Sequence, residues 1–228
     1  MKKLVLLLSV LAASAVAFGG DVASVSLDAG YNNYYIVNGT ARATDSAYVG
    51  FAAAKTLKYA EVYVAGTLLP SNGVDQSHWL LGTDKSVDLF KGVAVRLDGT
   101  VQRHENGNTG IKNSTEFGTK LSIVNSFVTP YIRGSYDLDL QQYGWAVGAE
   151  RVQKLLFGFT ATPAVEFGKW SDYQSVVAKA TLARPIGSFV PYFEAAYVDG
   201  DFHTSNYTLT SHKFNGNLVY SGGIKYSF

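Results

Sequence analysis

The chain has 228 residues, of which 16% are charged, with 23 Gly, 15 Tyr, 13 Phe and no Cys. Its 19 Lys and Arg residues nearly balance its 18 Asp and Glu residues, which excludes the strong basic excess of a nucleic-acid-binding protein. Without cysteine the fold cannot rest on disulfide bonds, so it needs an apolar core or a lipid surrounding.

The N-terminus carries the three parts of a secretory signal peptide in the usual order. Basic Met1-Lys2-Lys3 precedes an apolar run from Leu4 to Val16, and Ala15-Val16-Ala17 is a small-x-small cleavage site. The apolar run is too short to cross a bilayer as a helix. We predict a signal peptide over residues 1–17 and one mature domain over residues 18–228, with a buried N-terminal helix as the alternative. The mature chain keeps 17 basic and 18 acidic residues.

The rest of the chain consists of about twelve segments in which apolar and polar residues alternate, a period that predicts β-strands. Gly, Asn, Asp, Ser and Pro separate the segments, as turn-forming residues do. The predicted strands cover residues 23–37, 46–56, 59–69, 78–88, 93–104, 113–123, 128–137, 143–153, 157–168, 173–183, 189–199 and 217–228.

The connectors between these segments alternate in length. The short connectors are 57–58, 89–92, 125–127, 154–156 and 185–188, and the longer ones are 38–45, 71–77, 105–112, 138–142, 169–172 and 200–216. Outer-membrane barrels have short periplasmic turns and longer external loops, and their sheets close because hydrocarbon does not tolerate bare strand edges. The pattern predicts an all-β fold, a transmembrane antiparallel up-and-down β-barrel of about 12 strands. A soluble β-sandwich has no reason for this alternation.

The two faces of each predicted strand differ in chemistry. In 189–198, Phe189, Phe193 and Tyr197 alternate with smaller or charged residues such as Glu194 and Ala196. We expect the first set to face lipid and the second to line the lumen. By this parity the lumen-lining charges are the acids Asp28, Glu61, Asp84, Asp98, Glu116, Glu150, Glu166 and Glu194 and the bases Arg96, Lys120, Arg133, Lys179 and Lys225.

Aromatic residues gather at the ends of the predicted strands. Trp79, Trp145 and Trp170 lie next to long connectors, and we assign them to an aromatic belt. The same belt takes Tyr34, Tyr35, Tyr48, Tyr136, Tyr143 and Tyr173, and a second belt by the short turns takes Tyr59, Phe90, Phe127, Phe157, Phe189, Tyr226 and Phe228. The β-propensity of aromatic residues is the alternative explanation, but it does not account for their position at strand ends.

The chain ends in LVYSGGIKYSF, with Leu218, Tyr220, Ile224, Tyr226 and Phe228 on one face of the last strand. This ending resembles the C-terminal signature of bacterial outer-membrane proteins, which have alternating apolar residues and a terminal Phe. The resemblance implies that Tyr226 and Phe228 form an assembly signal read by the barrel assembly machinery. It also implies location in the bacterial outer membrane, with outer-membrane lipids and lipopolysaccharide as surroundings.

The layout is also loosely similar to the TorF-type small porins, whose first strand ends in Tyr-x-Phe-Arg-Gly. The matching stretch here runs from Tyr35 to Gly39. Tyr35 and Gly39 fit the pattern, whereas Val37 and Asn38 replace its Phe and Arg.

Catalytic and metal-binding readings find weaker support. His203-Thr204-Ser205-Asn206-Tyr207, with Asn217 further on, is similar to the His-x-Ser-Asn-Gly motif of outer-membrane phospholipase A, but Tyr207 replaces the glycine and the stretch falls in the longest loop. The histidines His78, His104, His203 and His212 show no spacing that demands a metal site. The acidic pairs at 137–139 and 199–201 lack the rest of a calcium-loop pattern. We therefore expect no enzyme activity and no cofactor.

Two function classes remain open from the sequence. The first is a small porin or channel for small hydrophilic solutes, with a weak cation preference from the surplus of lumen acids. The second is a plugged structural or adhesive barrel whose loops, especially 199–216, bind a partner. The oligomeric state is left open.

Overall fold

The structure is a computed structural model that describes residues 24–37, 40–71, 74–106, 113–125, 127–139, 141–170, 173–200 and 214–227. The predicted signal peptide, Phe228 and the loop carrying His203 and His212 lie outside these ranges. The strands are β1 (Ser24–Val37), β2 (Thr40–Thr56), β3 (Glu61–Ser71), β4 (Val74–Phe90), β5 (Val93–Asn106), β6 (Ser114–Asn125), β7 (Thr129–Asp137), β8 (Gln142–Glu150), β9 (Gln153–Lys154), β10 (Thr160–Trp170), β11 (Tyr173–Ala183), β12 (Phe189–Gly200) and β13 (Phe214–Ser227).

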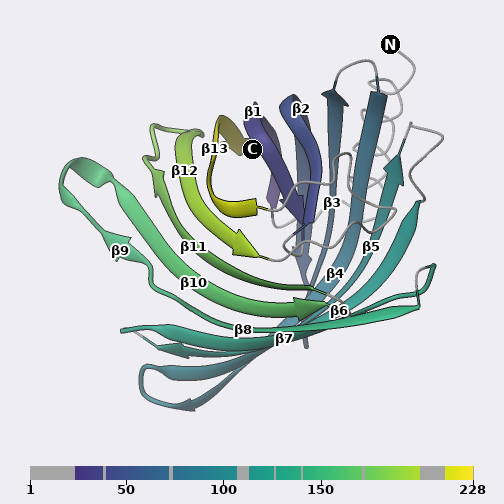
Figure 1. Cartoon of the computed structure of the whole chain (residues 1–228). Coiled ribbons are helices and arrows are strands. Elements are labelled where there is room, and N and C mark those ends of the chain that lie inside the picture. Colours follow the sequence, from purple (N-terminus) through teal and green to yellow (C-terminus); the bar gives the residue numbers. More distant parts are fainter. Residues whose placement is uncertain are drawn as a thin grey trace.

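The strands pair antiparallel in chain order, except that β8 and β9 both pair with β10, and β13 pairs with β1 to close the sheet (Figure 1). The short β9 continues β8 after a break at Arg151 and Val152, so that the thirteen labelled strands make one closed 12-strand barrel. The only helical turn in the described part of the chain is η1 (Leu156–Gly158). No helix there is long and apolar enough to cross a membrane. The predicted fold class and strand number are confirmed.

Beyond the last register pair of β1 and β13, the side-chain amide of Asn33 makes hydrogen bonds to the backbone of β13. The last register pair at this seam is Asn32 with Ser221. Next to it, Asn33 accepts a hydrogen bond from the Tyr220 backbone N–H at 2.7 Å and donates one to the Leu218 carbonyl at 3.1 Å. The side chain satisfies backbone groups that an unpaired strand would leave open.

Three of the predicted long connectors are wrong, and one of them, 169–172, shortens to 171–172 because β10 runs to Trp170. β2 begins at Thr40 and β4 at Val74, ahead of the predicted starts at 46 and 78. The ladders continue to Val37↔Thr40 and to Ser71↔Val74, so only short links remain there. Alternation of apolar and polar residues marks the part of a strand that has one apolar face. A strand end with mostly polar residues can still pair with its neighbour in water, but its sequence shows no such alternation.

The register assigns every residue of the barrel wall to one of two faces. Cross-strand partners point the same way, and one row of partners runs through Glu61, Asp84, Asp98, Lys120 and Arg133. The opposite face carries large apolar side chains that are about half exposed. Among them are Leu81, Leu97, Leu121, Ile132, Val147, Val165, Phe193 and Ile224. In a closed barrel one face points inward, and the residues lining the cavities described below identify it as the charged one.

Candidate functional site

All thirteen predicted lumen-lining charges share the inward face of the barrel. Their strands run around most of the wall: β1, β3, β4, β5, β6, β7, β8, β10, β11, β12 and β13. The register links them through rows of cross-strand partners, such as Asp28 with Lys225 and Glu61 with Asp84. Among themselves, most of them form ion pairs that lie along the wall.

Arg96 on β5 lies between two carboxylates. Its guanidinium pairs with Asp84 on β4, and its Nε donates a hydrogen bond to Asp98 Oδ1 at 3.1 Å. The Arg96 side chain remains 45% exposed, whereas the two acids are 15% and 13% exposed. The base therefore covers the acids from the lumen side and neutralises part of their charge.

A second network joins β7 to β10 across the intervening β8. Arg133 donates from Nη2 to Glu166 Oε1 at 2.6 Å and from Nε to Glu166 Oε2 at 3.0 Å. The Tyr131 hydroxyl donates to the same Oε2 at 2.9 Å. Lys120 Nζ lies 3.7 Å from Glu150 Oε1 and 4.1 Å from the centre of the Tyr131 ring. A bidentate arginine–carboxylate pair is among the more rigid polar contacts in proteins, so this wall segment has a fixed shape.

The opposite wall carries a looser set of contacts. Lys179 lies 3.4 Å from Glu194, which also accepts a hydrogen bond from the Thr181 hydroxyl at 2.8 Å. Asp28 accepts from the Tyr192 hydroxyl, at 3.2 Å and 3.0 Å to its two oxygens. Both side chains of the Lys179–Glu194 pair are at least a third exposed, so water screens the attraction between them.

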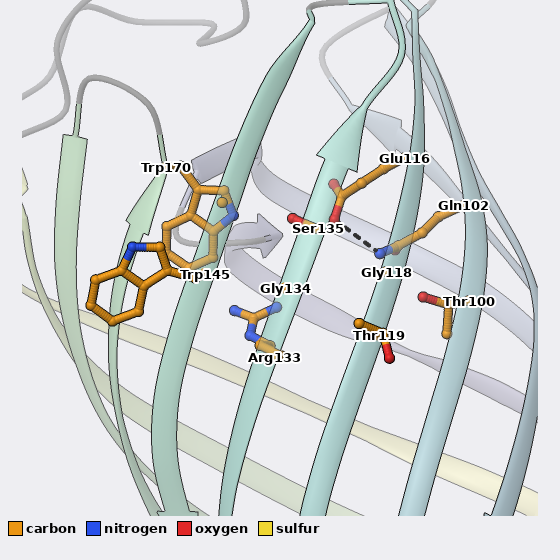
Figure 2. Close-up of a pocket in the computed structure, with 11 residues that line it drawn as sticks. Thr100, Gln102, Glu116, Gly118, Thr119, Arg133, Gly134, Ser135, Trp145 and Trp170 are labelled. Atoms are coloured by element: carbon orange, nitrogen blue, oxygen red, sulfur yellow. Dashed lines mark hydrogen bonds between the residues drawn. The ribbon is translucent and has the colours of Figure 1, made fainter.

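A small hollow of about 60 Å³ lies in the wall beside Arg133, and Figure 2 draws the residues that line it. Glu116, Gln102 and Thr100 line one side and Arg133 and Trp170 the other. The Gln102 amide donates to Glu116 Oε1 at 3.5 Å, and the Arg133 guanidinium lies 5.1 Å from the Trp170 ring centre. The hollow has the size of a few water molecules and polar walls to bind them.

Two larger cavities show which face is the interior. One, of about 270 Å³, is lined by Asp28 and Thr67 from β1 and β3 together with Thr181 and Glu194 from β11 and β12. The other, of about 290 Å³, brings Glu61 and Arg96 together with Ser26 and Lys225. Residues from strands this far apart along the sheet can line one space only on the concave side. The cavities therefore belong to the lumen.

Five aromatic side chains also point inward, and each has a glycine as a direct cross-strand partner. The pairs are Tyr48–Gly30, Tyr63–Gly82, Tyr131–Gly148, Trp170–Gly144 and Tyr192–Gly223. A Cβ built on Gly82 would lie 2.3 Å from the Tyr63 ring, and one on Gly144 would lie 2.0 Å from the Trp170 ring. The rings thus lie flat over the glycines, which holds them against the wall and out of the middle of the lumen.

The predicted belt tryptophans divide between the two faces. Trp79 and Trp145 have outward parity, with Trp79 packed edge-on to Phe51 and Trp145 tilted against Phe167. Trp170 has inward parity and is 8% exposed, so its placement in an outer belt is corrected. Tyr48 is likewise inward and 8% exposed. Strand-end position cannot separate the two faces, because neighbouring residues at an end point opposite ways.

The remaining aromatic residues lie as follows. Tyr136 and Tyr143 face outward near the long connectors, while Tyr59, Phe90, Phe127, Phe157 and Phe189 are exposed at the short turns. Tyr226 of the predicted assembly signal pairs with Leu27 and lies 4.8 Å from the Phe189 ring. Its partner in that signal, Phe228, is outside the described residues, as are the side chains of Tyr34, Tyr35 and Tyr173.

His78 and His104 are cross-strand partners with stacked rings, 4.3 Å between centres. Within the described ranges no three His, Cys, Asp or Glu side chains converge as metal ligands would. The phospholipase-like stretch from His203 to Tyr207 is outside those ranges, and so is the Asn217 side chain.

Sequence reasoning missed the inward aromatic residues Tyr63, Tyr131 and Trp170, and the inward Asp137, which is 7% exposed. A usable signal was present: each inward ring has its glycine on an adjacent strand. Finding the pair requires the exact register, which a sequence period does not fix.

No protein-family model and no curated protein sequence matches the chain. Solved structures do match. The KdgM porin superposes with a TM-score of 0.56 at 9% identity, covering 90% of this chain and 99% of that one, and a second KdgM structure, in complex with disordered oligogalacturonate, gives the same values. The NanC porin superposes with a TM-score of 0.56 at 11% identity, covering 89% and 98%. At such identities the likeness concerns the fold, which is that of small outer-membrane porins.

Proposed function

We propose that the chain forms an outer-membrane channel that passes small hydrophilic solutes. The observation that carries this proposal is the contrast between the two faces of a closed barrel. The inward face bears the thirteen predicted charged side chains, Asp137 and two polar cavities, while the outward face bears half-exposed Leu, Ile, Val and Phe. Only an apolar surrounding makes such an outer face favourable over the whole circumference.

The contacts of the inward side chains run along the wall, which supports an open path through the barrel. Each ion pair described above joins residues on the same strand or on strands at most two apart, as in Arg96–Asp84 and Arg133–Glu166. Long side chains that pair along a wall do not reach across a pore. The flat packing of the five inward rings over glycines also keeps side chains out of the middle of the lumen.

The finer parts of this proposal concern location and assembly. We place the short turns on the periplasmic side and the longer connectors outside, among lipopolysaccharide. The predicted signal peptide would carry the chain across the inner membrane, and the barrel assembly machinery would read Tyr226 and Phe228. The fold shared with the KdgM and NanC porins supports the outer membrane as the location.

We further propose a weak preference for cations. The register adds Asp88 and Asp137 to the eight predicted inward acids and Lys154 to the five predicted inward bases, so a surplus of four negative charges faces the lumen. Four of the five predicted bases make ion pairs with inward acids, and the fifth, Lys225, is the cross-strand partner of Asp28. The bases thus neutralise acids locally, and the surplus sets the sign of the field in the pore.

The test is the conductance of the refolded mature chain in a planar lipid bilayer. We expect discrete conductance steps whose size scales with KCl concentration. A barrel that folds, as judged by its heat-modifiable mobility on a gel, but shows no steps would reject the channel. That result would favour the structural or adhesive barrel, whose 199–216 loop lies mostly outside the described residues.

A further inference from the structure

The outer surface at the short-turn end combines bases with aromatic rings. Four base–ring pairs lie there: Lys58 and Lys85 over Tyr59, Arg151 over Phe127, and Arg184 over Phe159. The distances from Nζ or Cζ to the ring centres are 5.0, 6.0, 4.9 and 5.3 Å. The other two base–ring pairs of the described residues, Lys120–Tyr131 and Arg133–Trp170, lie on the inward face. We call the first set the rim pairs.

The rim pairs are spread around the barrel end. Tyr59 lies in the β2–β3 turn, Phe127 in the β6–β7 turn, and Phe159 at the start of β10. Two of the bases, Arg151 and Arg184, have their backbones fixed by hydrogen bonds from their N–H groups to the carbonyls of Pro163 and Pro191. The positions of these cations are therefore set by the barrel wall.

The charge of this rim is one-sided. Its outward and turn residues include the bases Lys55, Lys58, Lys85, Lys91, Arg151 and Arg184, whereas the acid Asp88 and the base Lys154 have inward parity at this end. At the opposite end, the described residues on the outer surface carry both signs, with Arg103 and Lys169 beside Glu105, Asp139 and Asp199. The asymmetry separates one end of the barrel from the other.

The same rim exposes apolar side chains to an unusual degree. Leu156 and Phe157, in the turn between β9 and β10, are 80% and 82% exposed, and Phe90 is 67% exposed. Phe157 has φ of 60°, which holds the ring at the tip of this turn in a conformation that costs a non-glycine residue free energy. A groove of about 490 Å³ near Phe90 is lined by Leu89, Lys91 and Val124 as well.

We propose that the rim pairs bind the head groups of anionic phospholipids in the leaflet that faces the short turns. A lipid interface presents phosphates beside glycerol and acyl carbons, and the rim presents cations beside exposed aromatic and aliphatic carbons at the edge of the apolar band. Charge complementarity selects anionic over zwitterionic lipid. This inference rests on the membrane location proposed above, but it does not require an open pore.

The test compares lipid retention by the refolded barrel in native mass spectrometry. The full mature chain is released from detergent with an equimolar mixture of phosphatidylglycerol and phosphatidylcholine of matched acyl chains. We expect phosphatidylglycerol to be retained several-fold over phosphatidylcholine. The variant Arg151→Gln/Arg184→Gln should bring the retention of the two lipids close to equal, because each base near a lipid surface contributes up to roughly fivefold to the binding of anionic lipid.

The control variant Arg103→Gln/Lys169→Gln removes the same charge from the outer surface at the opposite end. We expect it to keep the wild-type preference, and Arg151→Lys/Arg184→Lys to retain most of it. Equal retention of the two lipids by the wild type would overturn the proposal and favour a protein partner for the rim. Equal losses in both double variants would also overturn it, because the effect would then be one of net charge. Displacement by an equal concentration of inorganic phosphate would rule out lipid as the specific ligand.

Gel mobility and conductance separate this inference from the proposed function. Rim variants that fold and conduct but lose lipid preference support the inference. A wild-type barrel that selects phosphatidylglycerol but never conducts would reject the channel and leave the rim assignment standing.

Discussion

At the scale of single residues, the face of the strand on which a side chain lies decides whether it contacts lipid or the lumen. Phe193 and Val165 are each 52% exposed on the outer face, and Thr162 is half-buried on the inner face of the same barrel. Both faces alternate along each strand with a period of two, so a substitution moved by one residue changes its solvent completely.

We predict that Phe193→Arg and Val165→Arg each lower the free energy of unfolding in lipid vesicles by about 2–4 kcal/mol, because the guanidinium would lie in hydrocarbon near the middle of the bilayer. Thr162→Arg is the matched control and should cost much less, since its head group reaches lumen water. Ala196 is a poorer control than parity alone suggests, because it is 7% exposed and an arginine there would displace its neighbours. Denaturant titration of vesicle-inserted protein measures the differences, and equal costs on both faces would refute the assignment of faces.

A glycine beneath an inward ring should control the width of the lumen. Gly82→Ala would bring a Cβ to 2.3 Å from the Tyr63 ring, and the flexible end of the tyrosine can move only toward the lumen. We expect a smaller single-channel conductance with little change in barrel stability. The double variant Gly82→Ala/Tyr63→Ala should restore conductance to the wild-type level or above. A lasting decrease in the double variant would place the effect in the strand and not in the ring.

At the scale of the strands, the number and the antiparallel order were predicted correctly from the sequence. These features follow from the period of two, which is strong wherever one side of a strand is apolar. The starts of β2 and β4 were not predictable in this way, because the added residues 40–45 and 74–77 are mostly polar and show no run of large apolar residues on one face. Trp170 was misplaced for a related reason: its assignment depends on register, and a ring over Gly144 looks in the sequence like any belt aromatic.

The network between β7 and β10 gives a prediction about strand cohesion. Glu166 accepts three hydrogen bonds from Tyr131 and Arg133, and its side chain is 17% exposed. We expect Glu166→Gln to lower the free energy of unfolding by about 1–3 kcal/mol, because it weakens charge-assisted bonds to groups that stay half-buried. Glu194→Gln on the more exposed Lys179 pair is the control and should cost under about 1 kcal/mol. Urea titration in vesicles would show the order, and the reverse order would contradict the geometry.

The closing strand gives a second prediction at this scale. β13 meets β1 from Ser26↔Ser227 to Asn32↔Ser221, so its C-terminal end completes the barrel. Deleting Phe228 should lower the amount of barrel inserted in the outer membrane and leave more chain to periplasmic proteolysis, because the segment read by the assembly machinery loses its terminal ring. The same variant should still fold in detergent. Normal outer-membrane levels would show that the terminal Phe is not an assembly signal.

At the scale of the whole molecule, the charges divide into three zones with different roles. The inward face is acidic in sum but paired in detail, the short-turn rim is basic, and the apolar band between the ends is nearly uncharged. Fields from the rim act on the lipid and decay within a Debye length of about 8 Å at physiological salt. The surplus inside the lumen is less screened, because low-dielectric walls confine its field to the pore.

Ion selectivity therefore depends on the inward surplus and not on the net charge of the chain, which is close to zero. A surplus of four carboxylates concentrates cations in the pore at low salt. At 1 M salt the Debye length falls to about 3 Å, so the surplus no longer reaches across the lumen and the preference should fade. We predict a reversal potential of the cation-selective sign across a low-salt KCl gradient, and a value near zero when both sides are near 1 M.

Glu61→Gln removes an inward acid that lines the same cavity as Arg96 and should move the low-salt potential toward zero. Lys169→Gln on the outer face should leave it unchanged. Anion selectivity of the wild type would contradict the assignment of the inward charges.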